Sequence, residues 1–464
     1  MKRRTRFLVL ASTALVAVAG IGLRPDRALR TATGMSAHDL CSETFVAGLD
    51  PKQTFAQSIA PRPGVSALAR ALRYRIDDET REAQVSLLGA IESRAIYREG
   101  WGCVLVHGDE RIDNPPPMRP DAKPAEVVGF PTVEPAIVVA RNPALKAAID
   151  AAFAEPRNAP HRWTRAVVIV RDGEIIGERY APGYRVDTPM LGFSMTKSVM
   201  NALVGILARQ GAVDVEKPAP IAAWQNANDP RRAITLEHLM RMETGLALDE
   251  TGSGFDPSNQ MFYDEPDMAA YAERAQPVAP PHQRWHYSSA STHLVARIVR
   301  DAVGGDGLSV QRFAERELFE PLGMKHVVME MDATGTPVGG HYLYASARDW
   351  ARFGQLFLDD GVIDGERLLP KGWVRWSTTP TLGTDYGAGW WTNRGDDEAA
   401  VHRRHVGIPE DAFFATGNLG QRIAVIPSER LVIVRMARAH MKYGDMAGFE
   451  RLVTDTIDSL HAER

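Results

Sequence analysis

The sequence predicts an α+β protein, and three features carry that prediction. Residues 166–170 and 175–177 are apolar runs on either side of an Asp-Gly turn, a pattern typical of a β-hairpin. Two further β-branched runs, at 422–426 and 431–434, indicate another hairpin in a central sheet. Roughly residues 195–360, between the two hairpins, are mainly helical in pattern. Strands on both sides of a helical middle make the class α+β.

Helices are predicted before, within and after these strands. Apolar residues recur at helical spacing over residues 142–153 and again at 449–460. A third stripe, at 199–207, continues from Ser194 and meets a plausible C-terminal stop at Gly211. Ser194 is therefore expected at a helix N-terminus.

The region before residue 136 has a different character. Three short strand patterns predict a small β-rich extension whose role is open, and seven prolines after it predict a semi-extended linker or a strap across the surface. The strand patterns lie at residues 73–76, 84–88 and 103–106. The predicted organisation is a β-rich extension at 20–110, a linker at 111–135 and a main domain at 136–464.

Residues 1–19 have the pattern of a secretory signal peptide. Four basic residues up to Arg6 precede an apolar run at 7–16, and Ala17-Val18-Ala19 fits a cleavage site. The competing interpretation is an uncleaved anchor over residues 7–23, which is short for a bilayer span and interrupted by polar residues. We favour cleavage and export to the periplasm, and we expect membrane contact only if this segment stays uncleaved.

Export would allow the two cysteines of the chain, Cys41 and Cys103, to form a disulfide. The alternative is two separate buried thiols, because sequence alone cannot place their Cα atoms.

The net charge of -4 gives no electrostatic footprint for nucleic acid, so a nucleic-acid partner is not expected.

The strongest chemical signal is Ser194-Met195-Thr196-Lys197. Residues three apart share a helix face, so the Lys197 amine can approach the Ser194 hydroxyl, and free N–H groups of the first turn favour developing negative charge. This combination suits a nucleophile with an adjacent base. The alternative is a simple N-cap serine with a solvated lysine, which the four residues alone do not exclude.

Two later segments favour the chemical interpretation. Tyr287 lies in a turn before a helical pattern, where a nearby ammonium would favour the phenolate and let it act as a general base. Residues 413–421 then run into the last predicted hairpin.

Ser194-x-x-Lys197, Tyr287-Ser288-Ser289 and Ala415-Thr416-Gly417 resemble the three motifs of the serine β-lactamase and penicillin-binding-protein superfamily, in its class C-like branch. Segments at 235–246, 351–358 and 368–374 extend the resemblance over roughly residues 140–460. It implies an antiparallel sheet flanked by helices, an inserted α-helical subdomain, and an active site between them.

The resemblance also implies site residues. Ser194 would be the nucleophile, Lys197 and Tyr287 would exchange its proton, and the N–H groups of Ser194 and Asn418 would bind the oxyanion. Ser289, Ala415, Thr416 and Gly417 would face the substrate. Neither a cofactor nor a metal is expected.

Two departures from the motifs bear on substrate. Ser289 stands where an amide-binding asparagine is usual, and Ala415 where a carboxylate-binding lysine is usual. The stretches at 386–391 and 417–421 are closer to 6-aminohexanoate-dimer hydrolases and esterases. We therefore expect a small ester or linear amide as substrate, with a β-lactamase or D-alanyl-D-alanine peptidase as the alternative. Five aromatic residues could form apolar walls of the cleft, although aromatics at such spacings are more often part of a core: Trp285, Trp390, Trp391, Phe413 and Phe414.

Other interpretations are weaker. An inactive binding module would not need the serine, lysine and tyrosine together, and the Ser-His-Asp triad of an α/β-hydrolase has no distinctive partner segment here. His402-Arg403-Arg404-His405 fits no zinc spacing, so a solvated loop or local packing is favoured. Asp249, Glu250, Tyr263 and Asp264 are expected to be ordinary surface residues, although their position could border the cleft.

Overall fold

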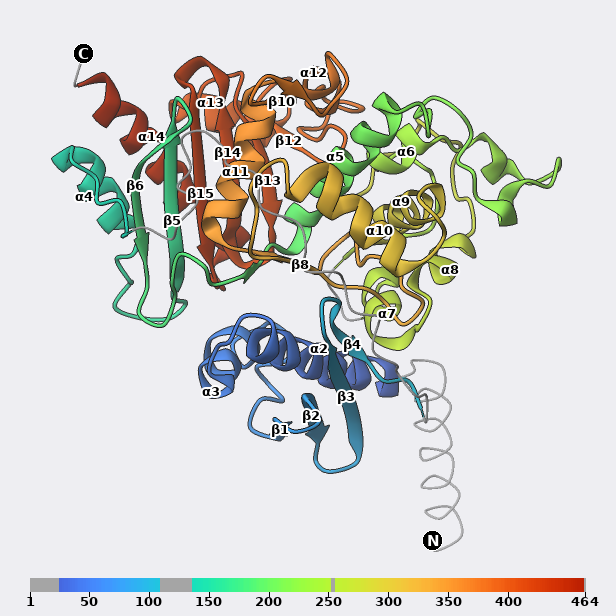
Figure 1. Cartoon of the computed structure of the whole chain (residues 1–464). Coiled ribbons are helices and arrows are strands. Elements are labelled where there is room, and N and C mark those ends of the chain that lie inside the picture. Colours follow the sequence, from blue (N-terminus) through green and yellow to red (C-terminus); the bar gives the residue numbers. More distant parts are fainter. Residues whose placement is uncertain (1–24, 109–135, 252–254, 463–464) are drawn as a thin grey trace, which may run out of the picture.

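The computed structural model describes residues 25–108, 136–251 and 255–462. Its main part is built on a six-stranded antiparallel sheet in the order β12-β13-β14-β15-β5-β6 (Figure 1). The strands are β5 (Thr164–Arg171), β6 (Glu174–Tyr180), β12 (Trp391–Thr392), β13 (Phe413–Gly417), β14 (Gln421–Ile426) and β15 (Leu431–Ala437). The two predicted hairpins are thus β5–β6 and β14–β15, and they pair with each other through β15 and β5.

Helices cover both faces of this sheet. Val167 and Ile169 of β5 pack with α4 (Pro143–Ala152) and α14 (Met446–His461), whereas Val168 and Val170 face the larger core that includes α11 (Ala347–Leu358). Figure 1 shows α4 and α14 on one side of the strands and α11 on the other. Because both faces are buried, the strands appear in the sequence as continuous β-branched runs rather than as alternating ones.

The helical part lies beside the sheet, at the β13 end, as the predicted inserted subdomain (Figure 1). Its main helices are α5 (Thr196–Arg209), α6 (Leu236–Met240), α7 (Pro257–Asp264), α8 (Met268–Glu273), α9 (Ser289–Ala302) and α10 (Gly307–Ala314). Two short helices, α12 (Trp373–Ser377) and α13 (Glu398–His405), come between α11 and the last strands. A three-stranded sheet and a two-stranded hairpin join these parts: β7 (Met190–Leu191), β8 (Val327–Met329) and β9 (Leu343–Ala345), and β10 (Val362–Ile363) with β11 (Glu366–Arg367).

The N-terminal extension contains a four-stranded antiparallel meander and two helices. The strands are β1 (Leu72–Asp77), β2 (Glu82–Leu87), β3 (Ile91–Arg98) and β4 (Gly102–Leu105). The helices α2 (Pro25–Phe45) and α3 (Pro51–Thr54) are absent from the predicted elements. Helix α2 lies between the meander and the main part of the molecule, so the extension is not β-rich alone (Figure 1).

The expected disulfide is present: Cys41 of α2 is bonded to Cys103 of β4. The proline-rich segment 111–135 and the signal-like residues 1–19 lie outside the described residues, so the proposed division of the chain stays a prediction. Within the ranges given above, no helix has both the length and the apolar character that a bilayer span needs.

Candidate active site

Ser194 lies in a tight turn between the small sheet and the main helix of the site. A 3₁₀ turn over Phe193–Met195 leads directly into α5, as the expected helix start requires. Phe193 has φ +49°, a left-handed conformation that costs a side-chain-bearing residue about 1–2 kcal/mol. Ser194 is half-buried, whereas Phe193 and Met195 are buried. The turn therefore presents one side chain, the Ser194 hydroxyl, to solvent.

Lys197 is buried against Ser194. Its Nζ donates to Ser194 Oγ at 3.0 Å, to Ser289 Oγ at 2.9 Å and to the Gly340 carbonyl at 2.8 Å. Burial lowers the pKa of Lys197 to about 8, against the opposing effect of the Glu250 carboxylate. A neutral amine keeps two N–H groups and gains a lone pair. The Gly340 carbonyl can only accept, so it keeps one of these N–H groups and the Ser289 hydroxyl keeps the other. The lone pair of Lys197 can then accept the hydrogen of the Ser194 hydroxyl.

Tyr287 comes from the turn before α9, and its ring centroid lies 4.8 Å from Lys197 Nζ. Burial and the nearby Tyr386 and Glu250 raise its pKa well above the usual value, and a hydrogen bond with Ser194 opposes this only in part. The phenol is therefore neutral at neutral pH. The expectation of a phenolate is wrong, because burial raises the pKa of Tyr287 by more than the hydrogen bond with Ser194 and the charge of Arg422 lower it.

The third motif reaches the site through backbone contact. A Cβ built on Gly417 would lie 2.1 Å from the Gly192 carbonyl oxygen, so only glycine allows the end of β13 to approach the Ser194 turn this closely. Asn418 follows and is exposed. Arg422 Nη1 donates to the Gly417 carbonyl at 2.6 Å, and Gln421 Nε2 donates to the Asn418 carbonyl at 3.1 Å. These bonds hold the turn, while the use of its N–H groups as oxyanion donors stays a prediction.

Two predicted substrate-binding residues are buried in the structure. Ser289 is fully buried and bonds Lys197, and Ala415 is 1% exposed and packs in the larger core. Helix α9 turns Ser289 toward the lysine and β13 turns Ala415 inward, and a substrate-binding role for the two residues stays a prediction. Thr416 is half-buried and is the member of that strand motif nearest to solvent.

Aromatic side chains pack around Tyr287. Its ring stacks on Trp391 at 5.7 Å between centroids and meets Tyr386 edge-on at 5.8 Å. Trp285 contacts both of these rings. Trp285 and Trp391 are half-buried and fit the expected walls, whereas Tyr386 is buried behind them. The other three expected wall residues are in the core: Trp390, Phe413 and Phe414.

Glu250 belongs to the site, although a surface role was expected for it. Its Oε2 accepts from the Ser289 N–H at 2.8 Å and from Ser258 Oγ at 3.1 Å, and its charge acts on Lys197. Tyr263 is also buried rather than on the surface, with its hydroxyl 3.1 Å from that of Tyr342. Only the position of Glu250 in the segment before Tyr287 could have indicated its role from sequence.

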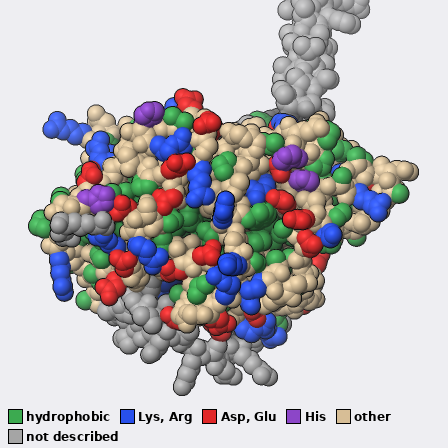
Figure 2. Space-filling view, turned by 90° about the horizontal axis from the view of Figure 1, so that it is seen from above, with side chains coloured by type: hydrophobic (Ala, Val, Ile, Leu, Met, Phe, Trp, Pro, Cys, Tyr) green, Lys and Arg blue, Asp and Glu red, His purple; other side chains and the backbone are tan. Residues whose placement is uncertain are grey.

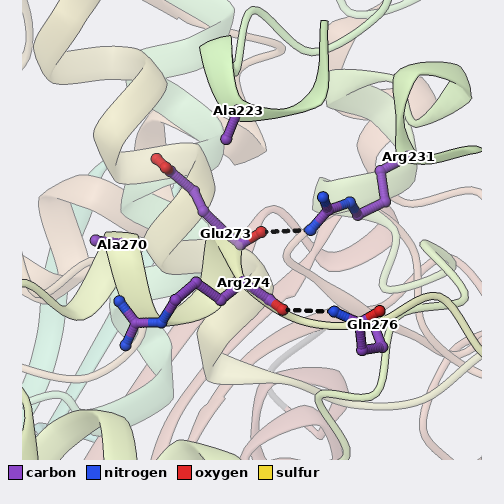
Figure 3. Close-up of a pocket in the computed structure, with 6 residues that line it drawn as sticks. All are labelled: Ala223, Arg231, Ala270, Glu273, Arg274 and Gln276. Atoms are coloured by element: carbon purple, nitrogen blue, oxygen red, sulfur yellow. Dashed lines mark hydrogen bonds between the residues drawn. The ribbon is translucent and has the colours of Figure 1, made fainter. Parts of the chain in front are cut away.

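Three other features do not join this cluster. His402–His405 forms the end of α13, where buried Arg403 bonds Asp385 at 2.8 Å, so the expected local packing is confirmed in a helix rather than in a solvated loop. The described residues hold no group of three histidine, cysteine or acidic side chains suited to a metal. A pocket of about 430 Å³ shares no residue with the site; Arg231 donates to the Glu273 carbonyl at 2.8 Å on its wall (Figure 3).

Charges are mixed over the molecular surface seen from above. Figure 2 shows lysine and arginine side chains interspersed with aspartate and glutamate around apolar patches, without a broad field of one sign. This matches the small net charge of the chain.

The comparison with known families agrees with the geometry. The Beta-lactamase family model matches residues 149–450, well over half of the chain. The chain belongs to this family.

Individual relatives are distant. The 6-aminohexanoate-dimer hydrolase of Paenarthrobacter ureafaciens is 24% identical over 226 residues, which cover 46% of this chain and 56% of that protein. The match thus spans little more than half of that relative's length.

Solved structures show the same fold. A penicillin-binding protein homolog from Caulobacter crescentus has a TM-score of 0.54 at 18% identity, over 69% of this chain and 98% of that one. EstCE1, described as a hydrolase with promiscuous acyltransferase activity, has a TM-score of 0.53 at 13% identity, over 68% of this chain and 97% of that one.

Proposed function

We propose that this protein hydrolyses a small ester or linear amide through an acyl-enzyme on Ser194. The observation that carries the proposal is the 3.0 Å hydrogen bond between Lys197 Nζ and Ser194 Oγ, made by a buried amine whose pKa is lowered to about 8. A general base works best when its pKa is near the working pH, and this lysine meets that condition.

The steps follow from the positions of the groups. Neutral Lys197 takes the Ser194 proton as Oγ attacks the carbonyl carbon, and the N–H groups of Ser194 and Asn418 stabilise the oxyanion. The leaving oxygen or nitrogen then takes a proton from the neutral Tyr287 hydroxyl, which Lys197 reprotonates. Water attacks the acyl-enzyme by the same route in reverse, releasing the acid and restoring Ser194.

The substrate class rests on what surrounds Ser194. No lysine stands at position 415, and Ser289 is bonded to Lys197 instead of being available to an amide. The half-buried Trp285 and Trp391 offer apolar surface next to Tyr287. A modest acyl group with an aliphatic chain suits these walls better than a bicyclic β-lactam. The 6-aminohexanoate-dimer hydrolase relative supports the linear amide as one candidate.

Three substitutions test the proposal with p-nitrophenyl acetate as substrate. Ser194→Ala should abolish turnover and fluorophosphonate labelling, and Lys197→Ala and Tyr287→Phe should each lower kcat about 10²–10⁴-fold. Ser198→Ala is the control, because Ser198 lies in the same helix but its hydroxyl bonds the Gly389 carbonyl and not the Lys197 amine. Near-wild-type rates in Ser194→Ala would refute the mechanism. An unlabelled wild-type protein without any esterase activity would favour an inactive binding module.

We also propose export to the periplasm with removal of the N-terminal segment. The Cys41–Cys103 disulfide is compatible with an oxidising compartment, and the signal-like pattern of residues 1–19 supports the same location.

A further inference from the structure

Two buried arginines lie against the ring of Phe193, the residue that precedes Ser194. The Arg62 guanidinium carbon is 5.8 Å and that of Arg438 5.0 Å from the ring centroid. Both distances are within the range of cation–π attraction. Phe193 itself is 1% exposed and holds the left-handed backbone described above. A strained residue keeps such a conformation only where its surroundings fix it.

Both arginines are held by acidic residues of the N-terminal extension. Arg62 Nη2 donates to Asp39 Oδ2 at 2.6 Å, and Arg438 Nη2 is ion-paired with Glu43 Oε1. Asp39 and Glu43 are four residues apart on α2 and so share one face of the helix. Figure 1 places α2 between the meander and the main part of the molecule. The helix therefore carries the two carboxylates to the arginines that face Phe193.

Further contacts tie the same helix to the central sheet. The second oxygen of Glu43 accepts from Arg165 Nη1 at 2.8 Å, at the start of β5. Ser58 Oγ accepts from Arg165 Nη2 at 3.0 Å and from Arg438 Nε at 3.2 Å. Burial alone would raise the pKa of Glu43, but Arg438 and Arg165 bring it below its ordinary value, so the carboxylate remains charged. A buried charge network of this kind has one well-defined geometry.

We propose that the N-terminal extension positions the nucleophile: Asp39 and Glu43 hold Arg62 and Arg438 against Phe193, and this contact maintains the backbone turn that presents Ser194 to Lys197. The inference rests on the proposed function, since it takes Ser194 as the nucleophile. Asp39, Glu43, Arg62 and Arg438 are positioning residues and do not touch the substrate. The extension is then part of the working enzyme and not a separate binding module.

Conservative substitutions in the full chain test this role. Arg62→Lys and Arg438→Lys keep the positive charge for the carboxylates but remove the planar guanidinium that lies on the ring. Each substitution should lower kcat for p-nitrophenyl acetate tenfold to a hundredfold at unchanged KM. This kcat is calculated per active Ser194, counted by titration with a fluorophosphonate. The matched control is Arg98→Lys in β3: Arg98 is equally buried and lies 5.2 Å from the ring centroid of Trp101, not Phe193. Its kcat per titrated site should stay at the wild-type value even where its Tm falls.

The outcomes separate the positioning role from a merely structural one. The proposal would be overturned if Arg62→Lys and Arg438→Lys kept the wild-type kcat per titrated site. In that case their only effect would be a lower Tm, as in Arg98→Lys. If an arginine variant does not fold, Phe193→Leu tests the contact independently. This substitution leaves the ion pairs intact and removes only the ring. It should lose kcat to the same extent, and a wild-type kcat would again overturn the inference. Activity remaining in Ser194→Ala would instead contradict the proposed function, so the two failures are distinguishable.

Discussion

Glu250 and Lys197 are linked through one residue: Ser289 donates its backbone N–H to the Glu250 carboxylate at 2.8 Å, and its hydroxyl accepts from the Lys197 amine at 2.9 Å. Glu250 also favours the charged form of the lysine, while burial disfavours it more strongly. The protonation of the proposed base is therefore set by a balance between burial and a single nearby carboxylate. Two predictions on pH follow from that balance.

The first is that activity depends on pH through Lys197. The lysine must be neutral to accept the Ser194 proton, and its pKa is lowered to about 8. For an uncharged ester, kcat/KM should rise about tenfold per pH unit below this value and level off above it. The measurement is a rate profile from pH 6 to 9.5 with p-nitrophenyl acetate. Tyr287→Phe should lower the whole curve without removing its acid limb. A profile that is flat between pH 6 and 9 would rule out Lys197 as the base.

The second prediction concerns Glu250→Gln. Glutamine keeps an acceptor for the Ser289 N–H but removes the charge that raises the pKa of Lys197. The acid limb should therefore move to lower pH, and kcat/KM at pH 6.5 should rise about two- to tenfold. Asp249→Asn is the control, because the adjacent Asp249 is ion-paired with Arg284. A movement of the limb to higher pH in Glu250→Gln would contradict the assigned electrostatics.

Much of the fold could be predicted because its elements carry a regular pattern. The two hairpins and the helices α4, α5 and α14 have apolar runs or stripes matched to the faces they bury. Helix α2 was missed for a physical reason. It contacts the meander on one side and α7 and the arginine network on others, and its buried positions include threonine, serine, aspartate and glutamate. A helix enclosed on several sides by polar partners has no single apolar stripe.

Only the contacts between residues close in sequence could be predicted in the candidate site. Ser194 and Lys197 share one helix turn, so their contact follows from sequence. The contacts of Tyr386 with Tyr287, and of Arg62 and Arg438 with Phe193, join segments far apart in the chain and carry no local signal. The sign of the Tyr287 pKa shift was likewise unpredictable, because it depends on how completely the phenol is removed from water.

The third prediction concerns the disulfide and export. Cys41 and Cys103 are 62 residues apart, so their bond closes a long loop and should stabilise the protein by about 2–4 kcal/mol. Reduction, or Cys41→Ser with Cys103→Ser, should lower the unfolding midpoint in urea accordingly. Mass spectrometry of the native protein should find a start near Gly20 and a peptide linking the two cysteines. A full-length chain with two free thiols would contradict both expectations.

The last prediction concerns substrate preference. Ala415 is buried, Ser289 is engaged by Lys197, and Trp285 and Trp391 offer apolar surface beside Tyr287, so binding energy should come from the aliphatic part of a modest acyl group. We expect kcat/KM to be highest for short-chain esters or aminohexanoate-type linear amides and at least tenfold lower for nitrocefin and D-Ala-D-Ala peptides. One panel of these four substrate types measures it. Ala415→Lys is an informative variant, but its buried site makes the charge costly, so Thr416→Lys, at the half-buried position next to it, is the better probe. It should raise the rates on nitrocefin and D-Ala-D-Ala peptides relative to the rates on uncharged short-chain esters. A wild-type preference for nitrocefin or for the D-Ala-D-Ala peptide would instead favour the β-lactamase or peptidase alternative.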